Sequence, residues 1–367
     1  MGDAHVRLRR LPAVPASSVA MTAEISAADH AAGDGGVEPD RPTSERRGAG
    51  AARFLVFKVG RALLVVIAAT MLTQFLLGLA PGGVSATILG EAGSPEAIAE
   101  LDRELGLDRP FLVQYVDWAG GVVTGDLGRS PVDQREVWDA ITTALPVTIE
   151  LTVLATTMAL VLAITTALWS ARRPGGVVDR LMGALTSASL SVPTFVLGPV
   201  LLYFLAVQTN VFPVTGWNPL SEGLGANLET AFLPALCVAI PEFAVFQRLF
   251  RGDLVATLEE DYIDAARARG ISEGRIMVRH AFRPASISLM TVTGISIGRL
   301  LGGTVVVEAL FVLPGLGLLL QQSIIRRDLI VVQGIVAFIA VTYVTVNLVV
   351  DLLYGVVDPR IRARAGR

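Results

Sequence analysis

The chain has 367 residues, of which 52% are hydrophobic and only 17% are charged, and its mean hydropathy is +0.59. This composition is typical of a membrane protein and excludes an ordinary soluble domain. The net charge of -3 and the pI near 5.7 speak against a nucleic-acid-binding protein, because phosphate recognition needs a clustered basic face.

Residues 1–52 differ in composition from the rest of the chain. They are rich in Ala, Gly, Pro, Asp and Arg and show no hydrophobic periodicity. Such a segment does not bury enough apolar surface to offset the entropy lost on ordering, so we expect a disordered cytoplasmic tail. The first long apolar run begins only after Arg61, too far into the chain for a cleaved signal peptide.

Long apolar runs predict the membrane spans, because a helix needs about 20 apolar residues to cross a bilayer. Four runs carry no charge, and two weaker runs carry one each, Glu242 and Arg299. A further run at 309–325 is interrupted by a proline and two glycines, which is typical of a re-entrant segment. We therefore predict an all-α integral membrane protein with six transmembrane helices. These lie at residues 62–80, 151–171, 181–209, 230–247, 284–307 and 329–350.

Basic residues predict the orientation, since short cytoplasmic loops carry an excess of Arg and Lys. With the N-terminus inside, most arginines fall on the cytoplasmic side, whereas the loop at 210–229 has none. The long first outer loop, from 81 to about 148, mixes acids with arginines, and Arg326 and Arg327 are exceptions on the outer side. We expect both termini in the cytoplasm and a large first extracytoplasmic loop.

The cytoplasmic loop between the fourth and fifth predicted spans has a distinctive charge order. Acidic residues come early in its first helical stretch and Arg267 and Arg269 come late, as the helix dipole favours. Gly270 is expected to end this helix in a left-handed conformation, and Ser272 to cap a second helix that ends at Pro284. Two angled helices would then face the cytoplasm. The residues alone leave open whether they dock a partner or form an amphipathic surface element.

This loop resembles the "EAA" loop of binding-protein-dependent ABC importer permeases. The pattern is Asp264-Ala-Ala-x-x-x-Gly270, with Asp264 where the general pattern has Glu. The longer string around it is similar to the dipeptide, oligopeptide and nickel branch of that family, although Pro284 replaces an Asn found in many relatives. Further matching motifs lie at 105–110, 114–115, 125–128, 145–148, 191–195, 300–303, 308, 311, 314–317, 327–328 and 333–334. The resemblance covers about residues 55 to 362.

The resemblance implies a permease subunit of an ATP-driven importer of di- or oligopeptides in the cytoplasmic membrane. Expected partners besides lipid are a second homologous permease, two ABC ATPases and an extracytoplasmic peptide-binding protein. ATP and Mg would be bound by the ATPases, so this chain would need no cofactor. The implied organisation is a first transmembrane helix with an extracytoplasmic loop domain at 53–147, a five-helix permease core at 148–358 with a coupling loop at 253–284, and a basic cytoplasmic tail at 359–367.

The same resemblance implies a coupling contact between this loop and an ATPase. The residues expected to form it are Tyr262, Asp264, Ala265, Ala266, Arg267 and Gly270. The small pair Ala265 and Ala266 would let a partner approach closely. Arg248 and Arg251, at the base of the fourth span, are expected to brace the loop, although interfacial anchoring by snorkelling explains them equally well.

No sequence pattern indicates chemistry within the chain. A phosphate-binding P-loop needs Gly-Lys followed by Ser or Thr, and the only lysine, Lys58, lies between Phe57 and Val59. The three histidines are scattered and do not have the spacing of metal ligands, and a single cysteine forms no intramolecular disulfide. We therefore expect no catalytic, cofactor-binding or metal-binding residues.

Four polar residues within the predicted spans are candidates for the transport pathway. Glu242 and Arg299 would be costly against lipid, so they should face each other, a partner subunit or the pathway. A sharper hypothesis is that Arg299 passes the carboxylate end of a peptide. Gln74 and Tyr203 are weaker candidates, because single polar residues in spans often only bond neighbouring helices.

Three alternative functions remain open from the sequence. The nearest is a nickel or other small-solute importer with the same architecture. An ion-driven secondary transporter would show internal repeats and buried acids in several spans, and neither is clear here. An intramembrane enzyme would need a nucleophile with a base, or a metal pair, and no such set is visible.

Overall fold

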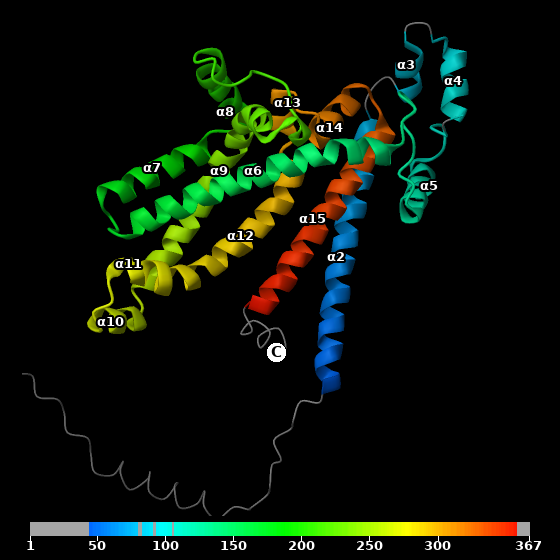
Figure 1. Cartoon of the computed structure of the whole chain (residues 1–367). Coiled ribbons are helices and arrows are strands. Elements are labelled where there is room, and N and C mark those ends of the chain that lie inside the picture. The colour runs from blue at the N-terminus through cyan, green and yellow to red at the C-terminus, as the bar shows by residue number, and fades with distance from the viewer. Residues whose placement is uncertain (1–43, 80–82, 91–92, 105, 358–367) are drawn as a thin grey trace, which may run out of the picture. The chain divides into compact units, whose positions relative to one another are not determined.

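The structure is a computed structural model that describes residues 44–79, 83–90, 93–104 and 106–357. The expected basic tail at 359–367 and most of the expected tail at 1–52 lie outside these residues. Residues 44–52 instead belong to the first helix, which the alanines and arginines there favour. In chain order the helices are α2 (Ser44–Gly78), α3 (Val84–Leu89), α4 (Pro95–Glu104), α5 (Phe111–Thr124), α6 (Val137–Ala171), α7 (Val177–Ser191), α8 (Thr194–Leu201), η2 (Leu202–Val207), η3 (Leu220–Glu222), α9 (Leu224–Leu258), α10 (Asp261–Ala268), α11 (Glu273–Arg275), η4 (Ile276–Ala281), α12 (Phe282–Gly303), α13 (Val305–Phe311), α14 (Leu316–Ile325) and α15 (Leu329–Val357) (Figure 1).

The described part of the chain contains five helices long and apolar enough to cross a membrane. They lie at Phe57–Gly78, Val137–Ala171, Leu224–Leu258, Glu273–Gly303 and Leu329–Val350. Two bent helix pairs are also apolar, so the described residues hold up to seven spans. The predicted all-α membrane fold is confirmed, while the count of six falls within this range and stays a prediction.

The span predicted at 181–209 is broken in the structure, because the chain bends by 106° between Val177–Ser191 and Thr194–Val207. Val192 and Pro193 at the bend have extended backbone conformations. The proline ring disfavours the helical conformation in the residue before it, and α7 ends at this point. The second bent pair, α13 and α14, turns by 82° and includes the segment expected to be re-entrant.

The contact between α6 and α9 is the most extensive between any two helices of the described chain. Its α6 side is a row of alanines at every fourth residue, which places them on one face, and none is more than 2% exposed. These are Ala155, Ala159, Ala163, Ala167 and Ala171. Large side chains of α9, including Phe246, Phe250 and Leu254, belong to the same core. Small residues on one helix therefore make room for large ones on the other.

Three glycines bring α12 close to α15. Gly294, Gly298 and Gly302 recur at every fourth residue of α12. A Cβ added to Gly294 would lie 2.4 Å from Val350 Cγ2, and one added to Gly302 would lie 2.7 Å from Ile339 Cγ2. The two helices therefore pack at a distance that larger residues would prevent.

A buried polar cluster fixes the bend between α13 and α14. The carboxylate of Glu308, which is 0% exposed, accepts hydrogen bonds from Thr304 Oγ1 at 2.7 Å and from the Gly317 amide at 2.6 Å. Thr148 of α6 accepts one from the Leu316 amide at 2.9 Å. The chain needs glycine at 315, where a Cβ would lie 2.3 Å from Glu308 Oε2. Every charged oxygen of this buried site thus has a partner.

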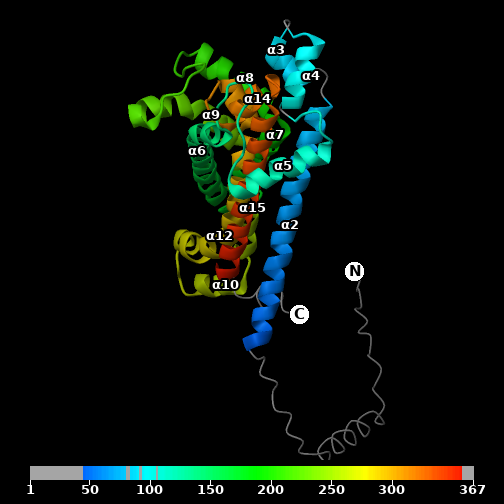
Figure 2. The ribbon, with the colours of Figure 1, turned by 90° about the vertical axis from the view of Figure 1, so that its right-hand side faces the viewer.

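The two ends of the helix bundle carry different elements. Helices α3, α4 and α5 lie at the end opposite to α10 and α11 in both views (Figures 1 and 2). At the first end, the Ser130 hydroxyl donates a hydrogen bond to the buried Asp328, whose other carboxylate oxygen accepts one from the Val331 amide at 3.2 Å. The loop before α6 is thereby attached to the start of α15.

We predict that Ala163→Leu lowers the thermal unfolding midpoint of the detergent-solubilised protein. The added atoms would enter a filled helix contact, and such overpacking costs about 1–3 kcal/mol. Thr165→Leu, on the exposed side of the same helix, is the matched control and should leave the midpoint nearly unchanged. Equal effects of the two substitutions would contradict the assignment of the alanine row to the α6–α9 contact.

Candidate partner-docking site and membrane-embedded ion pair

The elbow, as we call residues 261–275, consists of α10, α11 and the turn between them. Asp261 and Asp264 lie in the first turn of α10, where the positive end of the helix dipole favours them. Gly270 has φ of 77°, so its predicted left-handed conformation is confirmed. The amide of Ile271 donates to the Ala266 carbonyl at 3.3 Å, which satisfies an otherwise free carbonyl at the helix end.

The elbow shares a small hydrophobic core with the residues that flank it. Ile263, Ala266 and Ile276 are buried in it, with Leu258 and Ile271 packed alongside. Ala266 is only 4% exposed, so it does not face outward as the small pair was expected to do. Ala265 does lie on the exposed face of α10. The expected contact pair therefore divides into one surface residue and one core residue, because adjacent helical positions point in different directions.

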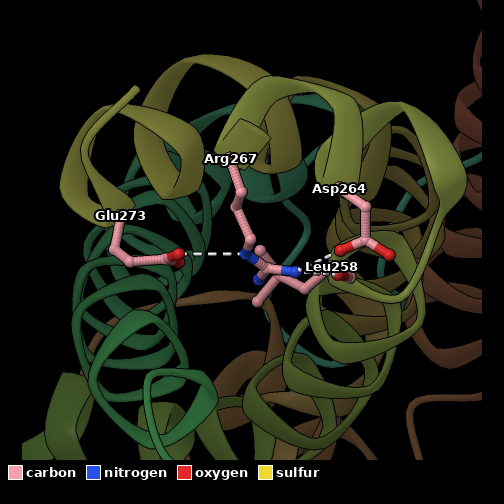
Figure 3. A network of polar contacts seen from close by, with 4 residues as sticks. All are labelled: Leu258, Asp264, Arg267 and Glu273. Carbon is pink, nitrogen blue, oxygen red and sulfur yellow. Dashed lines mark hydrogen bonds and ion pairs between the residues drawn. The ribbon is translucent and has the colours of Figure 1, made fainter. Parts of the chain in front are cut away.

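Arg267 ties the two helices of the elbow together (Figure 3). Its Nη1 donates to Asp264 Oδ1 at 2.8 Å, and its Nε donates to Glu273 Oε1 at 2.9 Å. These hydrogen bonds, first to Glu273 and then to Asp264, raise the pKa of Arg267, so it stays charged throughout the physiological range. All three side chains are well exposed, so each ion pair alone contributes little. The Glu273 pair joins α10 to α11, and the Asp264 pair lies within α10.

The second helix of the elbow continues into the membrane span without the boundary predicted at Pro284. Ser272 precedes it as expected but makes no side-chain capping bond, and helical structure continues from Glu273 to Gly303. Proline lacks an amide hydrogen, so the carbonyl of His280, four residues earlier, loses its usual helical partner. The π-helix η4 lies at this point, and the Tyr262 hydroxyl donates to that carbonyl at 3.4 Å. Burial and the nearby charge of Glu260 raise the pKa of Tyr262, so the hydroxyl keeps its proton.

A hollow of about 790 Å³ lies beside the elbow. It is bounded by the elbow, the end of α9 and the turn between α6 and α7, and its rim carries charges of both signs. The charged lining residues are Arg172, Arg173, Glu259, Asp264, Arg267 and Glu273. Such a rim suits a protein partner with mixed charges better than a simple anion. The two arginines of the α6–α7 turn were not assigned to this site from the sequence, since they are distant from the elbow in the chain.

Arg248 and Arg251 do not brace the elbow, which corrects the expectation from the sequence. Arg251 forms two hydrogen bonds to Asp179, at 2.9 Å from Nε and 2.7 Å from Nη2, and Arg248 Nη2 donates to Ser187 Oγ at 3.0 Å. Both partners belong to α7. The bidentate geometry holds α7 against the C-terminal half of α9.

The four pathway candidates occupy different surroundings. Glu242 of α9 and Arg299 of α12 form an ion pair at 2.6 Å, as expected for charges in membrane helices. Gln74 accepts a hydrogen bond from Gln333 Nε2 at 3.2 Å, which joins α2 to α15. Tyr203 of η2 accepts one from Nε2 of Gln208, the residue that follows η2, at 2.7 Å. The last two therefore fit the interpretation that single polar residues bond their neighbours.

Within the described residues, no group of three or more His, Cys, Asp or Glu side chains is arranged to hold a metal ion.

The long apolar helices, the bent pairs and the buried polar contacts define an α-helical, multi-pass membrane protein. The elbow adds an ordered, charged surface that such a protein could offer to another chain.

The chain belongs to the binding-protein-dependent transport system inner membrane component family, whose model matches residues 140–363. The model for the N-terminal part of such membrane components matches residues 51–152. The chain is thus a permease subunit of an ABC importer and is not itself an enzyme. Membership also implies ATPase and binding-protein partners.

Curated relatives match most of the chain. A "Probable peptide ABC transporter permease protein" of Sinorhizobium fredii is 36% identical over 287 residues, which are 78% of this chain and 92% of that protein. The "Dipeptide transport system permease protein DppB" of Escherichia coli is 36% identical over an alignment that covers 84% of this chain and 98% of that protein. Both are similar to this chain along nearly their whole length.

We predict that Gly270→Ala speeds amide hydrogen exchange in α10 about fivefold. A left-handed conformation costs a residue with a Cβ about 1 kcal/mol, which favours local opening of the elbow. Gly274→Ala is the matched control, because neither added Cβ would have a neighbour within 4 Å and only Gly270 has a positive φ. Position 274 lies in helix α11, where alanine is more favourable than glycine, so amide hydrogen exchange should slow in the control. Faster exchange in both variants would contradict the role given to Gly270.

Proposed function

We propose that this chain is a transmembrane permease subunit that carries di- or oligopeptides into the cell. The names of relatives that are 36% identical over most of their length support a peptide substrate. In this proposal the subunit works with a second homologous permease, two ABC ATPases and an extracytoplasmic peptide-binding protein. Both termini lie in the cytoplasm in this proposal. The proposed organisation of the chain comprises a first transmembrane helix with an extracytoplasmic loop domain at 53–147 and a permease core at 148–358, which includes the coupling loop at 253–284.

The elbow carries the proposed coupling to ATP hydrolysis. Its two helices share a small core and are joined by the Arg267–Glu273 ion pair, so a force applied to the elbow would move it as a unit. Its second helix continues into the span Glu273–Gly303, which offers a direct path from a docked ATPase into the membrane helices. Tyr262, Asp264 and Ala265 lie on its exposed surface and are the proposed contacts. Ala266, Arg267 and Gly270 would act by shaping the elbow.

A large charged residue on the exposed face should block this docking. We predict that Ala265→Arg lowers both the ATPase that co-purifies with the permease and the rate of peptide uptake by about tenfold, because a centrally placed clash removes a binding anchor. Ala256→Arg, at an exposed position of α9 outside the elbow, is the control and should retain the ATPase. Unchanged ATPase retention in the Ala265 variant would exclude the elbow as the docking surface.

The proposed orientation can be tested with cysteines. Val123 of α5 is 88% exposed and Ala268 of the elbow is exposed, whereas the native Cys237 is buried. In intact cells a membrane-impermeant maleimide should label Val123→Cys and should label Ala268→Cys only after the membrane is opened. Labelling of the elbow cysteine from outside would overturn the orientation and, with it, the coupling proposal.

Uptake assays separate the proposed function from its alternatives. Labelled dipeptides, longer peptides and Ni²⁺ are offered to proteoliposomes that contain the assembled importer, with ATP inside or outside. ATP-dependent uptake of peptides supports the proposal. Uptake of nickel alone would assign the small-solute alternative, and uptake that persists with an inactive ATPase would indicate an ion-driven transporter.

A further inference from the structure

The ion pair between Glu242 and Arg299 is strongly one-sided. The side chain of Glu242 is 6% exposed and that of Arg299 is 57% exposed. Only one contact joins them, from Arg299 Nη2 to Glu242 Oε1 at 2.6 Å. Within the described residues the other nitrogen donors of Arg299 hold no hydrogen bond. One donor of the guanidinium therefore contacts the buried carboxylate of Glu242, and its other donors are free to bind a further acceptor.

Arg299 lies on an otherwise apolar, exposed row of α12. Met290, Ile295 and Gly303 recur with it at intervals of four or five residues. A charged group on such a row is costly against lipid, because the bilayer core offers it neither water nor hydrogen-bond partners. This row should therefore face a polar environment in the assembled transporter, and a water-filled route between permease subunits is the environment that a transporter provides.

We propose that Arg299 is a substrate-positioning residue that binds the carboxylate of a passing peptide. This inference rests on the proposed function. A guanidinium presents parallel N–H donors that match the two oxygens of a carboxylate. Glu242 sets the strength of the interaction, since its charge offsets that of Arg299 and keeps the bound state weak. A route for transport needs such weak sites, because a tightly bound substrate does not leave.

The two partners of the pair then have opposite effects on substrate preference. Arg299→Gln removes the donors for the carboxylate and should reduce the preference for peptides with a free C-terminal carboxylate. Glu242→Gln removes the compensating charge and should increase this preference while slowing maximal uptake. A merely structural ion pair predicts that both substitutions impair transport in the same way, since each breaks the same contact.

The test compares uptake of labelled trialanine with that of trialanine amide by the full importer in proteoliposomes. The preference is the ratio of the two uptake rates, and any preference of the binding protein cancels when each variant is divided by the unaltered importer. We expect this ratio to fall about tenfold in Arg299→Gln and to rise in Glu242→Gln. Arg299→Lys keeps the positive charge but lacks the parallel N–H donors, so it should lose part of the preference, less than Arg299→Gln loses. Complexes are compared only after purification to the same subunit composition.

Several outcomes would overturn the inference. One is an unchanged ratio in Arg299→Gln, and another is a shift of the ratio in the same direction in both variants. If Arg299→Gln instead fails to assemble with the second permease while Arg299→Lys assembles with an unchanged ratio, Arg299 binds an acid of the partner and not the substrate. Failure of the unaltered importer to take up either peptide would count against the proposed function itself.

Discussion

The close contact between α6 and α9 is the constraint on which the rest of the structure depends. A row of alanines lets these two long helices approach, and large side chains of α9 fill the space that remains. Helix α9 then supports three separate features: it holds α7 through Arg251, it carries Glu242 towards α12, and it ends where the elbow begins. A change in this one contact would therefore move all three together.

Buried polar groups set the positions of the shorter elements. Glu308 and Thr148 hold the turn between α13 and α14, while Asp328 joins the loop before α6 to α15. Hydrophobic packing is weakly directional in lipid, because lipid tails are as apolar as the side chains. Hydrogen bonds between specific groups give these bent segments a single arrangement, whereas close packing is the main contact between the long apolar helices.

The sequence predicted the features that depend on local rules. The membrane class followed from long apolar runs, and the conformation of Gly270 followed from the end of a short charged helix. The restriction that Pro193 places on the residue before it could also have predicted the bend at this position. The apolar run continues on both sides of Pro193, however, and a single span was predicted there. At Pro284 the same kind of rule predicted a helix boundary that the structure does not have, because η4 and the Tyr262 hydroxyl compensate for the missing hydrogen bond of the proline.

The rest required distances between residues far apart in the chain. The partners of Arg248 and Arg251 lie on α7, more than sixty residues earlier, and no periodicity links them. The inward direction of Ala266 likewise depends on Ile276 across the turn of the elbow. Motifs at 145–148, 308 and 314–317 could be recognised separately, but only the fold explains them as one hydrogen-bonded cluster.

The uninterrupted helix from Glu273 to Gly303 has a mechanical consequence. Its 31 residues form a rod about 46 Å long, with the elbow at one end and Arg299 within one turn of the other. Long helices often bend at π-helical turns, so η4 is the point where such a rod can bend without losing its continuity. Under the coupling proposed above, a tilt of the elbow would reach the guanidinium to the extent that η4 does not bend, and nucleotide turnover would then change how long a substrate stays bound.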